Sequence, residues 1–185
     1  MMSKRKQMIF FVEGPEDMAF VDKILSRIFS DNSIDIISII PYQQKNNGNI
    51  RHDVKHAKAT GTDYVLLSDL DSHSYSCITS RKNKRVEEFY DRNTQEETFT
   101  LDEIIIVVEE LESWILAGID TSIGAYASLD IPEKTDHITK EKFNEIILNS
   151  KFNKLDLINP SDYDVKLAIK RNKSFKYFLE KYHCL

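Results

Sequence analysis

The sequence has few of the residues that mark specialised proteins: 185 residues include two cysteines, four prolines, five glycines and one tryptophan. Cys77 and Cys184 lie far apart and match no metal-binding spacing, so we expect reduced thiols, without a zinc site or a disulfide. With 41% hydrophobic and 30% charged residues, the composition is that of a soluble globular protein. The length fits one domain, or one domain with a small appendage.

Long hydrophobic runs are also missing. No apolar run approaches the roughly 20 residues that a bilayer span requires. Residues 1–7 are basic but lead into only about five apolar residues, too few for a signal peptide. We therefore expect a cytoplasmic protein that makes no membrane contact. The net charge of −5 excludes a uniformly basic surface for nucleic acid. Basic residues instead gather at 4–6, 81–85 and 166–176, runs that are also typical of solvated faces.

Four short segments rich in apolar or β-branched residues predict strands, at residues 8–12, 34–40, 64–68 and 103–108. Helical patterns separate them: a helix that begins at Pro15, then helices at 50–60, 84–92 and 111–117. This alternation favours parallel pairing with right-handed crossovers. We therefore predict an α/β fold, a Rossmann-like and mostly parallel four-stranded sheet flanked by helices.

No strand pattern follows residue 120. Segments 140–148, 161–171 and 174–181 are typical of short helices. The prediction is an α/β core at 1–120 and a small helical C-terminal extension at 121–185 that packs on the core, without either part folding alone.

Carboxylates follow three of the four predicted strands: Glu13, then Asp69 with Asp71, then Glu109 with its neighbour Glu110. In an open parallel sheet, ligands bind at the carboxyl ends of the strands. Residues two apart on an extended segment project to the same side, about 6.5 Å apart, so the Asp pair can converge on one cation.

Asp17, four residues after Glu13, and Glu112, three residues after Glu109, can point back toward those acids if helices begin there. Two like charges 4 Å apart repel by about 4 kcal/mol at an effective dielectric of 20. Protonation or a cation has to offset this, and an all-oxygen ligand set suits Mg²⁺ or Mn²⁺. The same acids also suit structural roles, because an Asp-x-Asp pair serves turns and acids in a first turn serve the helix dipole.

The order of Glu13-Gly14, Asp17 and Asp69-Leu70-Asp71 resembles the Toprim superfamily, which includes topoisomerases, bacterial primases, small ribonucleases and OLD-type nucleases. The resemblance covers roughly residues 8–118. The stretch 108–117, with a Glu just before a Trp-containing helix, is similar to small stand-alone Toprim-like proteins, some associated with phage defence. One departure is that Ser72 to Ser76 contains no glycine, which many Toprim domains have soon after the Asp pair.

The resemblance implies that Asp69 and Asp71 bind Mg²⁺ and that Glu13 binds metal or transfers a proton. Asp17 would help to hold a second ion. It also implies that Glu112 and Glu109 complete the metal shell.

The stretch 163–166 looks like a Tyr-x-x-Lys element of the small relatives. The resemblance thus gives Lys166 the task of neutralising charge on the scissile phosphate, beside the alternative of a helix-surface residue.

Three functions stay open. The first is a metal-dependent nuclease or phosphodiesterase acting on DNA or RNA, in phage defence or DNA repair, with basic runs holding phosphates. The second is a HAD-like phosphatase with Asp69 as nucleophile, which the missing Gly-Thr disfavours. The third is a catalytically silent regulatory subunit of Toprim fold, with a protein partner or as a homodimer.

Overall fold

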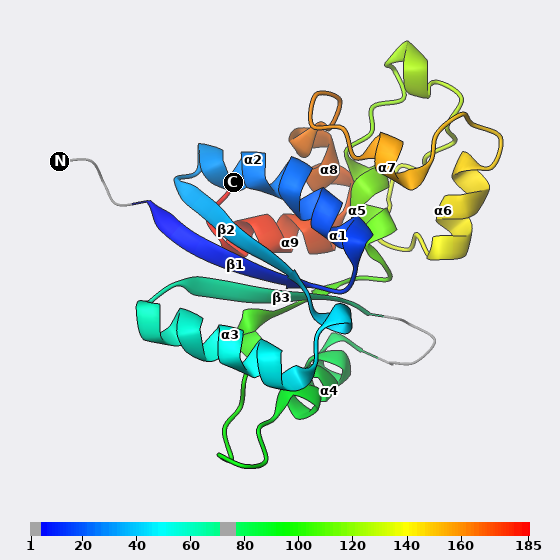
Figure 1. The fold of residues 1–185 in the computed structure, drawn as a ribbon. Coiled ribbons are helices and arrows are strands. Elements are labelled where there is room, and N and C mark those ends of the chain that lie inside the picture. The colour runs from blue at the N-terminus through cyan, green and yellow to red at the C-terminus, as the bar shows by residue number, and fades with distance from the viewer. Residues whose placement is uncertain (1–4, 71–76) are drawn as a thin grey trace.

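The computed structural model describes residues 5–70 and 77–185. In this part of the chain, four parallel strands form one sheet in the order β2-β1-β3-β4 (Figure 1). The predicted α/β fold with a parallel sheet is therefore confirmed. The strands are β1 (Lys6–Val12), β2 (Ile34–Pro41), β3 (Asp63–Asp69) and β4 (Ile104–Val107).

Both faces of the sheet are buried, which explains why its strands are nearly continuous apolar runs. In β1, Phe10 belongs to the hydrophobic cluster on one face and Phe11 to the cluster on the other, and both are fully buried. The alternation follows from the period of two along a strand. The structure is thus a sheet between two helical layers.

One layer contains the helices that follow β1 and β4, together with those at the C-terminus; α3 and α4 cover the other face (Figure 1). The α-helices are α1 (Pro15–Phe20), α2 (Ser26–Asp31), α3 (Asn47–Thr60), α4 (Ile78–Phe89), α5 (Leu111–Ala117), α6 (Lys140–Ile147), α7 (Lys154–Leu157), α8 (Val165–Arg171) and α9 (Lys173–Lys181). A π-helical turn, η1 (Val21–Leu25), joins α1 to α2, and the 3₁₀ turns are η2 (Tyr42–Gln44), η3 (Leu101–Glu103) and η4 (Gly124–Tyr126).

The C-terminal helices share the core of the sheet. Phe178 of α9 packs against Phe10 of β1 and Trp114 of α5, with ring centroids 6.3 and 5.2 Å away. The Trp114 indole nitrogen donates to the Ser174 hydroxyl at 2.7 Å. Because these contacts join residues before and after 120, the extension contributes apolar burial to the core. A boundary near residue 120 stays a prediction.

Predicted and observed helix starts differ most at two places. The helix expected at 84–92 begins at Ile78, with Cys77 as its N-cap, and ends at Phe89. The helix expected from 161 begins at Val165, because the Asp164 side chain caps the amide of Leu167. In residues 5–70 and 77–185, no helix combines the length and apolar character needed to cross a membrane.

Candidate metal centre

Backbone hydrogen bonds join the ends of β3 and β4, which brings the acids that follow these strands to one edge of the sheet. The amide of Leu70, just after β3, donates to the carbonyls of Val107 and Glu109 at 2.9 and 3.2 Å. Glu109 has a φ of 62°, a left-handed conformation that is uncommon for a residue other than glycine. The chain therefore turns at Glu109, and the next residue, Glu110, becomes the N-cap of α5.

Three carboxylates converge at this edge: Asp69, Glu110 and Glu112 each offer an oxygen, and these atoms lie within 4.8 Å of one another. Glu112 is only 3% exposed. Burial, and then the charges of Glu13, Asp17 and the other two acids of the group, raise the pKa of Asp69 well above its usual range. Burial and the charge of Glu112 also raise the pKa of Glu110. The group therefore resists carrying its full negative charge.

Asp17 stands beside this group, in the first turn of α1. Its carboxylate accepts a hydrogen bond from the amide of Gly14 at 3.0 Å. Burial raises its pKa to about 6; the Gly14 hydrogen bond opposes the rise, and the charges of Glu13 and Glu112 add to it. The residue thus caps α1, as its sequence position allows, and also belongs electrostatically to the acidic group.

A lysine from the C-terminal extension faces the acids. Lys154, the first residue of α7, lies 2.5 Å from a Glu112 oxygen and also pairs with Glu16. α7 packs against α1 and α5, which places the ammonium at this edge. Its charge acts on Asp17 and Glu110 as well. Lys154, together with the charge of Lys140 on Glu110, therefore offsets part of the negative charge at this edge.

Glu13 has different surroundings. Its carboxylate accepts hydrogen bonds from Arg85 at 2.7 Å, from the Tyr42 hydroxyl at 2.8 Å and from the Ser68 hydroxyl at 3.1 Å. Arg81 adds an ion pair at 3.5 Å and also donates to the carbonyl of Asp69. Burial and Glu13 together raise the pKa of the Tyr42 hydroxyl. Glu13 is therefore already neutralised by side chains of α4.

These arginines change the interpretation of the basic run at 81–85. Arg81 and Arg85 are 8% and 6% exposed, because they compensate Glu13 inside the structure. Lys84 stays exposed, and Lys82 donates to the carbonyl of Leu101. The run is therefore only partly available to an external phosphate.

The other predicted site residues have varied positions. Asp71 lies outside the described residues. Glu109 is half-buried and is not in the group of three, where its neighbour Glu110 takes the place expected for it. Lys166 is exposed in the first turn of α8, and no hydrogen bond or ion pair found in the described part of the chain joins it to the acids. Lys154 faces them instead, and no motif in the sequence indicated it.

The donor set fits a hard divalent cation. It consists of carboxylate oxygens without thiolate or imidazole, as Mg²⁺ and Mn²⁺ prefer. The three oxygens lie within 4.8 Å of one another, so changes of side-chain rotamer would be enough to bring them onto one ion. Asp69, Glu110 and Glu112 could therefore hold one ion.

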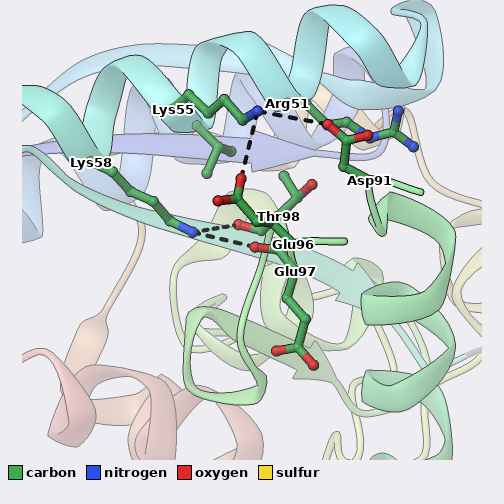
Figure 2. Close-up of a pocket in the computed structure, with 8 residues that line it drawn as sticks. Arg51, Lys55, Lys58, Asp91, Glu96, Glu97 and Thr98 are labelled. Carbon is green, nitrogen blue, oxygen red and sulfur yellow. Dashed lines mark hydrogen bonds and ion pairs between the residues drawn. The ribbon is translucent and has the colours of Figure 1, made fainter. Parts of the chain in front are cut away.

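Away from the three carboxylates, a hollow of about 400 Å³ lies between α3 and the segment 91–98. Figure 2 shows Lys55 reaching between Asp91 and Glu96, each 3.7 Å away, while Lys58 points at backbone carbonyls of the same segment. The side chain of Arg51 donates to the carbonyls of Phe89 and Tyr90. The basic face of α3 therefore holds this segment in place, through ion pairs of Lys55 and hydrogen bonds of Arg51 and Lys58.

No family model and no curated protein matches the chain. A search of solved structures finds the C-terminal region of the Burkholderia pseudomallei OLD protein, with 15% identity, 96% of this chain and 98% of that chain covered, and a TM-score of 0.46. A likeness of this size leaves the family undetermined, so the Toprim resemblance stays a prediction and the chemistry has to be inferred from the residues.

Proposed function

We propose that the chain is a metal-dependent phosphodiesterase that cleaves nucleic acid, with Mg²⁺ or Mn²⁺ at the Asp69, Glu110 and Glu112 group. The observation that carries the proposal is the convergence of these three carboxylates within 4.8 Å at the carboxyl edge of a parallel sheet. This is the edge at which open α/β sheets bind ligands.

The charge balance supports a cation there. Each pair of like charges at about 4 Å costs on the order of 4 kcal/mol at an effective dielectric of 20. Asp17 lies beside the three acids, and Lys154 supplies one positive charge. A folded domain has only about 5–15 kcal/mol of net stability. The site therefore needs protons or a further cation, and the raised pKa values of Asp17 and Asp69 show the same demand.

A bound divalent ion would polarise a phosphoryl oxygen and make water a better nucleophile near neutral pH. In hydrolysis, the oxygen of water bonds to phosphorus, the bond from phosphorus to the leaving oxygen breaks, and that oxygen takes up a proton. Asp69, Glu110 and Glu112 would hold the ion, and Lys154 would attract the anionic diester.

The other residues predicted for the site are not among the three proposed metal ligands. Glu13 and Asp17 raise the pKa of Asp69 through their charge, so both belong to its electrostatic surroundings, and a second ion held by them remains a prediction from the resemblance. The hydrogen bonds of Glu13 to Arg85 and Tyr42 make it a positioning residue for the end of β1. Asp71, Glu109 and Lys166 remain predictions from the resemblance.

A second candidate is the catalytically silent subunit, and one contact favours it. The Lys154 ammonium, 2.5 Å from Glu112, already supplies a cation to the most buried acid of the group. If that ion pair persists in the presence of metal, the acidic edge is a structural feature of a binding protein.

Hydrolysis in the presence of Mn²⁺ tests the proposal. The wild-type chain, Asp69→Asn and the matched control Asp63→Asn, at the exposed other end of β3, would be compared on a labelled oligonucleotide. We expect Asp69→Asn to lose at least about a hundredfold in rate, since a lost metal-site contact costs several kcal/mol, and the control to stay within about twofold. Equal rates for all three would indicate a contaminant and contradict the proposal.

A small diester and a small monoester separate the enzyme classes. A phosphodiesterase hydrolyses bis(4-nitrophenyl) phosphate, whereas turnover of 4-nitrophenyl phosphate alone would favour the HAD-like alternative. If Mn²⁺ raises the melting temperature without any turnover, the silent subunit is favoured.

A further inference from the structure

A cleft of about 520 Å³ opens directly beside the candidate metal centre. Glu112 and Lys154, which belong to that centre, line one end of it, together with Glu16. Lys140, Asn144 and Leu148 line it from α6 and the residue that follows this helix. Figure 1 shows α6 and α7 near the carboxyl ends of the strands. A molecule that reached the acids from this side would lie against α6.

The two faces of α6 differ in what they line. Lys140, Asn144 and Leu148 recur at four-residue steps and line the cleft. Lys142 and Asn149 line a separate hollow on the other side of the helix. Residues four apart share a helical face, so the first set forms one continuous strip next to the metal centre. The second set provides residues of the same types for comparison.

The strip combines the three kinds of group that bind an unpaired nucleotide. Leu148 is 76% exposed, so its apolar side chain is available to contact a base. The Asn144 amide can both donate to and accept from a base edge. Lys140, the first residue of α6, lines the same cleft as Glu112, so it offers a positive charge to a phosphate bound there.

Charge and size limit the occupant. Glu16 and Glu112 balance Lys140 and Lys154 in the lining, and a divalent ion at Asp69, Glu110 and Glu112 would offset two of the negative charges beside it. This favours an anion that arrives with the metal. The cleft has a volume of about 520 Å³. Ligand sites of about 300–1,000 Å³ suit small molecules, and a single nucleotide unit is of that class.

We propose that this cleft binds one unpaired nucleotide next to the scissile phosphate, so that the substrate is a single-stranded nucleic acid or a frayed end. The inference rests on the proposed function, because the metal centre supplies the charge that draws the phosphate in. The base lies against Leu148 with its edge toward Asn144, and Lys140 faces its phosphate.

Binding of a fluorescent oligothymidine tests the cleft independently of turnover. The full chain would be titrated in Mn²⁺ against a hydrolysis-resistant phosphorothioate single strand and a duplex of equal length, with anisotropy as the readout. The cleft variant is Asn144→Ala with Leu148→Ser; the matched control is Asn149→Ala with Lys142→Gln. All these residues are exposed, and melting temperatures check that both variants fold.

We expect the single strand to bind the wild-type chain at least tenfold more tightly than the duplex. The cleft variant should weaken single-strand binding about tenfold, as expected for the loss of one base contact, and the control should change it less than twofold. Lys140→Gln should also reduce the salt dependence of binding, because it removes a phosphate contact.

Equal binding of duplex and single strand, or equal effects of the two double variants, would overturn the proposal that the cleft binds an unpaired nucleotide. Absence of Mn²⁺-dependent hydrolysis of bis(4-nitrophenyl) phosphate by the wild-type chain would instead overturn the proposed function, while the anisotropy ratios still decide the cleft.

Discussion

The acids on the two sides of the end of β3 differ in how far nearby basic side chains neutralise them. Ser68 and Asp69 are neighbours, yet Ser68 donates to Glu13, which Arg81 and Arg85 neutralise, whereas Asp69 joins Glu110 and Glu112. On the Glu13 side, two guanidinium groups meet two carboxylates, Glu13 and Glu88. On the Asp69 side, the ammonium groups of Lys154 and Lys140 meet four acids when Asp17 is included.

This difference distinguishes an acid with a structural role from acids that are candidates for binding a ligand. A buried carboxylate that only stabilises a fold is paired within the protein, as Glu13 is. Acids that converge without enough internal cations decrease stability, so their presence indicates a ligand that compensates them. Both sets of acids follow strands in the sequence, and only the packing of α4 and α7 distinguishes them.

The largest expected effect is on the Glu13 side. Arg85→Met leaves a half-buried Glu13 without its nearest cation, so the free energy of unfolding should fall by about 3 kcal/mol. Lys84→Met, at the exposed preceding position, should change it by less than about 0.5 kcal/mol. Urea denaturation measures both. Similar values for the two variants would mean that Glu13 does not depend on Arg85.

The next effect concerns pH on the Asp69 side, in metal-free protein. Asp17 has a pKa of about 6 in the folded chain and an ordinary value of 3.8 when unfolded. The folded state thus holds this proton more tightly, and that contribution is present below about pH 4 and lost as pH rises through 6. Asp17→Asn keeps the cap without the charge, so its stability relative to wild type should rise by on the order of 2 kcal/mol between pH 4 and pH 7.5.

Unfolding in urea across this pH range measures the difference. With saturating Mn²⁺, the rise in stability of Asp17→Asn relative to wild type should disappear, because a bound cation would stabilise the ionised carboxylate. A difference between the two proteins that does not vary with pH would contradict the claim that Asp17 shares the charge of the acidic group.

The smallest effect is on metal affinity. Lys154→Gln removes the ammonium that competes for Glu112, so the dissociation constant of Mn²⁺ should fall about fivefold, equivalent to about 1 kcal/mol. Lys151→Gln, an exposed change three residues earlier, serves as the control. Calorimetric titration measures both. A weaker Mn²⁺ affinity in Lys154→Gln would show that the lysine organises the site instead of competing with the metal.

The sequence predicted the parts that depend on local pattern. The four strands were found because parallel strands buried on both faces are continuous apolar runs, and α5 was predicted with its observed bounds, Leu111–Ala117. The rule that strand ends share one edge predicted that Asp69 meets acids that follow β4, and Glu112 was expected there from its helical spacing and from the resemblance.

The remainder depends on long-range packing. Arg85 meets Glu13 across 72 positions, and Lys154 meets Glu16 across 138, so no periodicity could indicate either contact. The choice of Glu110 over Glu109 follows from the left-handed backbone at Glu109, which the sequence does not signal because the residue is not glycine.

Anomalous scattering from crystals soaked in Mn²⁺ tests the central claim most directly. The account predicts a manganese peak within bonding distance of carboxylate oxygens of Asp69, Glu110 and Glu112, with Glu13 still bound to Arg85. A map without a peak at these three acids, or with manganese bound only elsewhere on the surface, would contradict it.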